Sequence, residues 1–238
     1  MSKHAVVLIL THDAAGSIGA MIDFFVRSIF PRTQWGCSLV VVVANPGDRT
    51  SHIAKNVMKM HPEVHMLVAE EKEAIGAAYI DAFAYADQSL RADVLVEWDE
   101  DFQHPSDSLS DLLLPIERGA DLVIGCRNRP LEYLGPVDLL RLSLRKAGAF
   151  LVRLLVFFPF PEFRAIADPT AGLRATRVDG PFQKLHLSSF GARGLGCKIE
   201  MLYRLVGLGA QIAEVPLESR ARSPAESRIP VRRRWNPW

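Results

Sequence analysis

The sequence predicts an α/β fold in which a mainly parallel sheet is flanked by helices on both faces. Short runs of buried-strand type alternate with segments of helical periodicity through the first half of the chain, the order that produces parallel sheets. Polar side chains follow the first, second and fourth predicted strands, at Thr11, Asn45 and Asp99. Because ligands of such sheets bind beyond the carboxyl ends of the strands, these residues predict a functional site at that edge.

The alternation of strands and helices can be followed along the chain. Apolar runs predict strands at residues 5–10, 38–43, 64–68, 94–97 and 122–125. Helical spacing of apolar residues predicts helices at residues 17–29, 50–60, 74–89 and 106–118. The length of 238 residues suits one large domain, which we expect to span residues 1–228, followed by a basic, Trp-containing tail at 229–238.

Composition and charge exclude several classes of protein. The formal net charge of +1 creates no overall field for nucleic acid, so we expect no nucleic-acid partner. The cysteines are widely spaced and odd in number, which favours a reducing compartment and argues against zinc: Cys37, Cys126 and Cys197. The N-terminal apolar run is too short for a signal peptide, and Arg153 and Pro159 interrupt the stretch 150–160, so we expect no transmembrane span.

The run from Val94 to Pro105 carries the strongest chemical signal. A strand-like segment ends in Asp99, Asp101 and Gln103, which share one face if the backbone is extended, because side chains alternate along a strand. Carboxylate and amide oxygens suit Mg²⁺ or Mn²⁺, which often hold substrate phosphates as well. An isolated Asp-x-Asp is more often a solvated turn at the end of a strand, so the rest of the chain must decide between these interpretations.

The second half of the chain has a basic and aromatic segment at residues 136–163. Arg141, Arg145, Lys146 and Arg153 are interleaved there with leucines and phenylalanines, a pattern typical of a helix lying in a membrane interface. An ordinary core helix with solvated arginines is the commoner source of such a pattern. The two prolines and four phenylalanines at residues 156–163 nevertheless favour the interface interpretation, because the prolines prevent a long helix while the phenylalanines need an apolar environment. The tail, with arginines beside tryptophans, suits either an anionic lipid surface or solvent.

Six motifs follow one another in order from residue 99 onward, and together they are specific although each alone is weak. They are Asp99-Glu-Asp-Phe-Gln-His-Pro105, Gly119-Ala-Asp-Leu-Val-Ile-Gly-Cys-Arg127, Asp168-Pro-Thr-Ala-Gly-Leu-Arg174, Glu200-Met-Leu-Tyr-Arg204, Ile212-Ala-Glu-Val-Pro216 and Glu226-Ser-Arg228. With them the chain resembles the family 2 glycosyltransferases of the dolichyl-phosphate mannosyltransferase and polyprenyl-phosphate glycosyltransferase type. The resemblance implies a GT-A (Rossmann-like) fold and inverting transfer of a sugar from a GDP- or UDP-sugar to a polyprenyl phosphate.

The resemblance also implies roles for individual residues. The metal and diphosphate triad corresponds to Asp99, Asp101 and Gln103, with Mg²⁺ or Mn²⁺ as the cofactor. Catalytic roles fall to Asp101, to Arg127 near the phosphates and to Arg141, which meets the acceptor phosphate. The donor-binding positions are Thr11, Asp13, Asn45, Lys72, Asp99, Ser227 and Arg228. A phosphate acceptor is already ionised at neutral pH, so little or no general base is needed. The expected location is cytoplasmic, peripheral on the inner face of the membrane.

The departures from the family pattern lie mainly in the donor half. Ala14 and Asn45 stand where the family has acidic residues, and Glu71-Lys-Glu-Ala-Ile-Gly76 replaces a glycine-rich loop. Asn45 offers an amide donor and acceptor where a carboxylate only accepts, so the base that it reads remains open. Two alternatives therefore stand beside the lipid-phosphate transferase: a glycosyltransferase with a soluble acceptor, and a non-catalytic relative that binds a nucleotide or a lipid phosphate.

Overall fold

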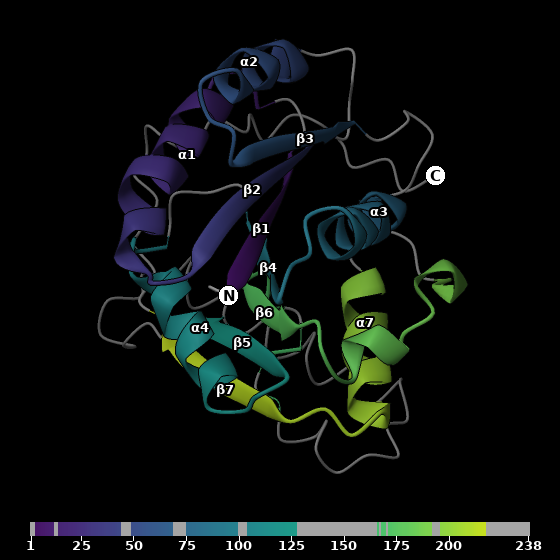
Figure 1. Ribbon diagram of the computed structural model, residues 1–238. Coiled ribbons are helices and arrows are strands. Elements are labelled where there is room, and N and C mark those ends of the chain that lie inside the picture. The colour runs from purple at the N-terminus through teal and green to yellow at the C-terminus, as the bar shows by residue number, and fades with distance from the viewer. Residues whose placement is uncertain are drawn as a thin grey trace, which may run out of the picture.

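A seven-stranded sheet with helices on both faces forms the molecule, as the computed structural model shows (Figure 1). The structure describes residues 3–11, 14–43, 49–68, 75–99, 104–127, 166, 168, 169, 171–191 and 196–217. Its strands are β1 (His4–Thr11), β2 (Gly36–Val43), β3 (Val64–Val68), β4 (Val94–Trp98), β5 (Leu122–Arg127), β6 (Arg174–Arg177) and β7 (Ile212–Leu217). Its α-helices are α1 (Ile18–Phe24), α2 (Arg49–Met58), α3 (Ile75–Gln88), α4 (Ser108–Glu117) and α7 (Gly196–Gly207).

The sheet is mainly parallel, as the sequence predicts, with one antiparallel strand in its middle. The strand order is β3-β2-β1-β4-β6-β5-β7, and β6 runs antiparallel to both of its neighbours. Thr11 pairs with Val43, and Val43 pairs with Val68, so β1, β2 and β3 end in one row. Trp98, the last residue of β4, pairs with Ile9 of β1, so β4 ends at the same edge. The carboxyl ends that were expected to form a functional edge therefore do lie together.

Two hydrophobic cores fill the spaces between the sheet and its helices. In Figure 1, α1, α2 and α4 cover one face of the sheet, and α3 and α7 cover the other. The alternation along β4 divides its side chains between them: Val94, Val96 and Trp98 join the first core, and Leu95 joins the second. Glu97 follows Leu95 at a step of two, and Asp99, directly after β4, follows at the next such step, so both carboxylates are expected on the side of α3 and α7.

The predicted elements of the first half are confirmed to within a few residues, with one difference in form. The helix expected at residues 17–29 is α1 followed by a π-helical turn from Phe25 to Ile29, where the Phe30 N–H bonds to the Phe25 carbonyl. This turn buries Phe25 completely, with its ring centroid 5.1 Å from that of Trp98 and 5.8 Å from that of Phe30. Aromatic packing at the end of β4 therefore outweighs regular helical geometry there.

The second half contributes β6, β7 and α7, none of which was predicted as an element. Short 3₁₀ turns at Phe182–Lys184 and Leu187–Ser189 connect β6 toward α7. Within the described ranges, no helix combines the length and hydropathy that a membrane crossing requires. The basic segment 136–163 and the tail 229–238 lie outside the described residues, so the interface and tail hypotheses remain predictions.

Phe25→Ala should destabilise the protein by about 3–5 kcal/mol, because it empties the space between α1 and Trp98. Met60, whose side chain is 71% exposed, offers a control, and Met60→Ala should change the free energy of unfolding by no more than about 0.5 kcal/mol. Urea denaturation measures both. A loss below about 1 kcal/mol for Phe25→Ala would mean that the π-helical turn does not anchor the end of β4.

Candidate active site

Two of the predicted site residues lie at the carboxyl edge of the sheet and have both backbone and side chain among the described residues. Thr11 is the last residue of β1, and Asp99 comes directly after β4. Arg174 pairs with Glu97 on one side and Ile124 on the other, so β5 ends at this edge too, with the backbone of Arg127. The other predicted site residues lie outside the described residues, namely Asp13, Asn45, Lys72, Asp101, Gln103, Arg141, Ser227 and Arg228.

The carboxylate of Asp99 rests directly against the backbone of Gly172. A Cβ atom placed on residue 172 would fall 2.1 Å from Asp99 Oδ2 and 2.2 Å from Oδ1. Real Cβ atoms never approach oxygen so closely, and the obstacle would be the charged group of a short side chain with little freedom to move. The glycine of the Asp168–Arg174 motif is therefore required by the position of Asp99. We call the peptide at residues 171–173 the Gly172 cradle.

A buried arginine holds the segment that leads into this cradle. Arg174 has no exposed surface, and its guanidinium donates to three carbonyls, those of Ala171 at 3.0 Å, Lys198 at 2.8 Å and Pro169 at 2.5 Å. Hydrogen bonds from a charged group stabilise by about 1.5–3 kcal/mol, more than those between neutral groups. Arg174 thereby ties the turn before β6 to the first turn of α7.

A second buried cation, Lys198 of α7, contacts the Gly172 cradle from the side of that helix. Its Nζ lies 3.1 Å from Glu97 Oε2, donates to the Gly172 carbonyl at 3.3 Å, and sits 4.7 Å from the ring centroid of Tyr79. The side chains of Lys198 and Glu97 are only 6% and 1% exposed. Neither Glu97 oxygen has a well-directed hydrogen bond within the described residues, so the charge of Lys198 is what neutralises that carboxylate.

The electrostatics of this pair favour the charged form of the lysine. Burial alone would lower the pKa of Lys198, but Glu97, Tyr79 and Asp99 together raise it above its ordinary value. Burial raises the pKa of the neighbouring Tyr79 hydroxyl to about 12. At neutral pH Lys198 is therefore an ammonium and Tyr79 a neutral phenol, and both lie beside Glu97. Sequence reasoning missed these residues, although Glu97 inside an apolar strand and Lys198 inside an apolar helix face were visible signals.

The residues described at this edge fit a hard divalent cation and a phosphate ligand. Asp99 supplies carboxylate oxygens of the kind that Mg²⁺ and Mn²⁺ prefer, in a cradle shaped around that carboxylate. The Thr11 hydroxyl at the end of β1 is buried and has no hydrogen-bond partner within the described residues. No cluster of three or more His, Cys, Asp or Glu forms within the described ranges, which include Asp99 alone of the predicted triad.

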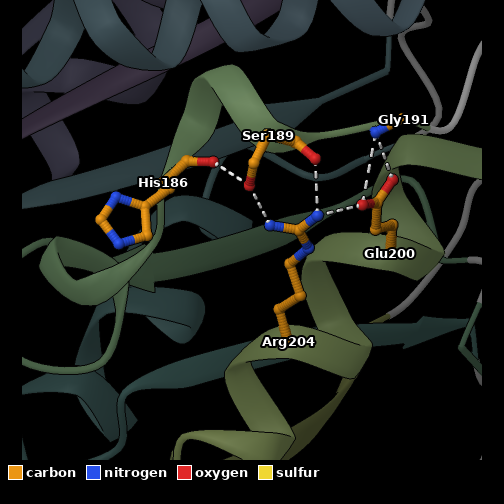
Figure 2. Close-up of polar contacts among 5 residues, drawn as sticks. All are labelled: His186, Ser189, Gly191, Glu200 and Arg204. Carbon is orange, nitrogen blue, oxygen red and sulfur yellow. Dashed lines mark hydrogen bonds and ion pairs between the residues drawn. The ribbon is translucent and has the colours of Figure 1, made fainter.

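The Glu200–Arg204 motif is a structural brace for α7 (Figure 2). Arg204 pairs with Glu200 at 2.6 Å and donates to both the hydroxyl and the carbonyl oxygen of Ser189, at 2.6 Å and 2.8 Å. Glu200 also accepts from the Gly191 N–H at 3.2 Å, and the guanidinium lies 4.4 Å from the ring centroid of Phe190. These contacts fasten the 186–191 loop to the helix that carries Lys198.

The three cysteines are free thiols with suppressed acidity. Burial raises the pKa of Cys37 and Cys126 to about 12 and that of Cys197 to about 11. The thiolate is the nucleophile and the metal ligand, so thiols with such pKa values react poorly at neutral pH. None of the three thiols is therefore a reactive nucleophile at neutral pH.

Comparisons with known proteins agree with this geometry. The family model for glycosyl transferase family 2 matches residues 6–166. An undecaprenyl-phosphate mannosyltransferase from Micrococcus luteus is 34% identical over 191 residues, which cover 80% of this chain and 74% of the relative. A polyprenol monophosphomannose synthase from Mycolicibacterium smegmatis is 33% identical over 195 residues, covering 79% of this chain and 70% of the relative.

Solved structures share the fold at lower identity. Mannosyl-3-phosphoglycerate synthase from Rubrobacter xylanophilus superposes with a TM-score of 0.64 at 19% identity, over 94% of this chain and 69% of the other. The mannosyltransferase PcManGT from Pyrobaculum calidifontis, in complex with GDP-Man and Mn²⁺, gives 0.59 at 19% identity, over 95% and 59%. From the family match, the identities to the relatives and the mixed sheet, the chain belongs to glycosyl transferase family 2 and is a glycosyltransferase of GT-A fold.

Proposed function

We propose that this glycosyltransferase moves a sugar from a nucleotide-sugar to a polyprenyl phosphate at a membrane surface, with Mg²⁺ or Mn²⁺ as cofactor. Support for the acceptor comes from the two relatives, whose names specify undecaprenyl phosphate and a polyprenol monophosphomannose product. Support for the donor and the metal comes from the structural neighbour that holds GDP-Man and Mn²⁺. The observation that carries the proposal is the carboxylate of Asp99, fixed in the Gly172 cradle at the carboxyl edge of the sheet.

The donor diphosphate would bind along this edge. Asp99, with Asp101 and Gln103 after it, would hold the cation, which supplies positive charge to the leaving diphosphate. Arg127, at the end of β5, and Arg228 would add further positive charge as the diphosphate leaves. The remaining donor contacts are proposed for Thr11, Asp13, Asn45, Lys72 and Ser227. Asn45 would contact the nucleobase, and its exchange for Asp would alter which base is preferred.

The acceptor phosphate would approach from the opposite side of the sugar. Its ionised oxygen attacks the anomeric carbon while the bond from that carbon to the diphosphate breaks, so the configuration inverts. Arg141 would orient the phosphate, and no proton needs to be removed because the phosphate is already an anion. The enzyme's own contribution is therefore positioning and charge, from a single catalytic domain at residues 1–228 acting on the cytoplasmic, inner face of the membrane.

The direct test is transfer of radiolabelled sugar from GDP-mannose, or from UDP-glucose, to undecaprenyl phosphate. We expect label in the organic phase with one of these donors, abolished by EDTA and restored by Mn²⁺ or Mg²⁺, because the cation is shared by enzyme and donor. Label that appears instead on a water-soluble acceptor such as 3-phosphoglycerate would overturn the proposal of a lipid acceptor. Transfer at an unchanged rate in the presence of EDTA would contradict the proposed dependence on a divalent cation.

Gly172→Ala should weaken Mn²⁺-dependent nucleotide binding roughly 10- to 100-fold, the usual effect of disturbing a group that supports a metal ligand. The new Cβ must displace the Asp99 carboxylate, which lies 2.1 Å from its position. Gly191→Ala is the matched control, because a Cβ there meets nothing within 4 Å. Isothermal titration with GDP and UDP in the presence of Mn²⁺ compares the two variants. Equal nucleotide affinities of the two variants would contradict the assignment of Asp99 as a metal ligand.

Membrane association is proposed from the sequence of segment 136–163. Binding to liposomes should increase with anionic lipid and fall with salt, since each surface cation contributes roughly 1 kcal/mol near an anionic headgroup. Exchanging Phe157 and Phe158 for Ser should reduce binding further by removing apolar insertion. Co-sedimentation measures both effects. Protein that stays in the supernatant at every lipid composition would exclude this segment as a membrane contact.

A further inference from the structure

The buried pair of Lys198 and Glu97 lies beneath the proposed metal site. Glu97 of β4 precedes Asp99 by two residues, and Lys198 contacts both Glu97 and the Gly172 carbonyl with one ammonium group. Tyr79 of α3 closes the opposite side, with its ring 4.7 Å from the Lys198 nitrogen. Four elements therefore meet at this ammonium: β4, α3, α7 and the Gly172 cradle.

Stability alone gives a poor reason for such a pair. Removing two charges from water costs several kcal/mol for each ion, and buried pairs can often be replaced by apolar residues without loss of stability. The space around Lys198 would accept an apolar contact, because Leu202 and Met201 of the same helix are already buried in the second core. An ammonium at this position is therefore better explained by what it holds than by the energy of its own burial.

The atoms that Lys198 holds are those that determine where Asp99 points. Its hydrogen bond fixes the Gly172 carbonyl, and the Gly172 Cα faces the Asp99 carboxylate with no room for a further atom. Its charge offsets Glu97, which would otherwise present a second carboxylate on the same side of β4 as Asp99. One side chain thus fixes both the geometry and the net charge behind Asp99.

We propose that Lys198 is a positioning residue, which holds the Gly172 cradle against Asp99 and neutralises Glu97 so that Asp99 can receive a divalent cation. This inference rests on the proposed function, because it assigns Asp99 to the metal. It predicts that the pair contributes to metal affinity more than it contributes to stability.

The deciding variant replaces the ion pair with an apolar pair, Glu97→Leu together with Lys198→Met. Its melting temperature should stay close to that of the wild type, because the exchange removes two buried charges and keeps the volume. Its affinity for Mn²⁺ in the presence of saturating GDP or UDP should fall by tenfold or more, as expected when support of a metal ligand is lost. The free Mn²⁺ signal in electron paramagnetic resonance measures affinity directly, without any turnover.

Arg177→Gln provides the matched control for a structural cation. Arg177 of β6 donates to the carbonyls of Ile116 and Ala120 and lies 3.7 Å from Asp121, but it pairs with Val94 at the other end of β4. This variant should lower the melting temperature and leave Mn²⁺ affinity as in the wild type. If the apolar pair does not fold, Lys198→Gln is judged by the same tenfold criterion.

Each outcome decides between the two proposals. A loss of Mn²⁺ affinity below tenfold in the folded variant would overturn the positioning role while leaving the proposed function intact. If neither variant folds, the pair is structural and the positioning role is also overturned. Wild-type protein that binds no Mn²⁺ with either nucleotide would overturn both the inference and the proposed function.

Discussion

The contact between the Asp99 carboxylate and the Gly172 backbone joins the two halves of the chain at the functional edge. It requires glycine at residue 172, because any Cβ would overlap the carboxylate. It also requires β6 to run antiparallel beside β4, since only then does the turn before β6 reach the end of β4. Arg174 and Lys198 hold that turn from within the core. The antiparallel strand in a mainly parallel sheet thus has a direct role in placing Asp99.

Buried charges are concentrated around this contact. Arg174, Glu97 and Lys198 are almost completely enclosed, whereas other ion pairs among the described residues are more exposed, as for Arg27 with Asp23. Exposed pairs contribute about 0–1 kcal/mol, while unpaired buried charges are far more costly. The most deeply buried charges among the described residues therefore lie where β4, the Gly172 cradle and α7 contact one another. The ion pair of Glu200 with Arg204 fastens the 186–191 loop to the same helix.

The strands and helices of the first half could be predicted because each carries its own periodicity, and Asp99 could be placed because it ends an apolar strand. The four-residue strand β6 could not be predicted, because it begins and ends with an arginine, Arg174 and Arg177, and its partner strands lie far away in sequence. The partnership of Lys198 with Glu97 depends on the packing of α7 under β4, which no local pattern reveals. Likewise, helical spacing at residues 17–29 cannot distinguish an α-helix from one that ends in a π-helical turn.

The most direct test of this account is anomalous diffraction from crystals of the protein grown with Mn²⁺ and the nucleotide that it binds better, GDP or UDP. The account predicts a manganese peak in contact with the Asp99 carboxylate, at the carboxyl edge of β4, with the nucleotide phosphates on the far side of the ion and the ammonium of Lys198 still on the Gly172 carbonyl. A peak at another position, or nucleotide bound at this edge with Asp99 turned away from it, would contradict the assignment.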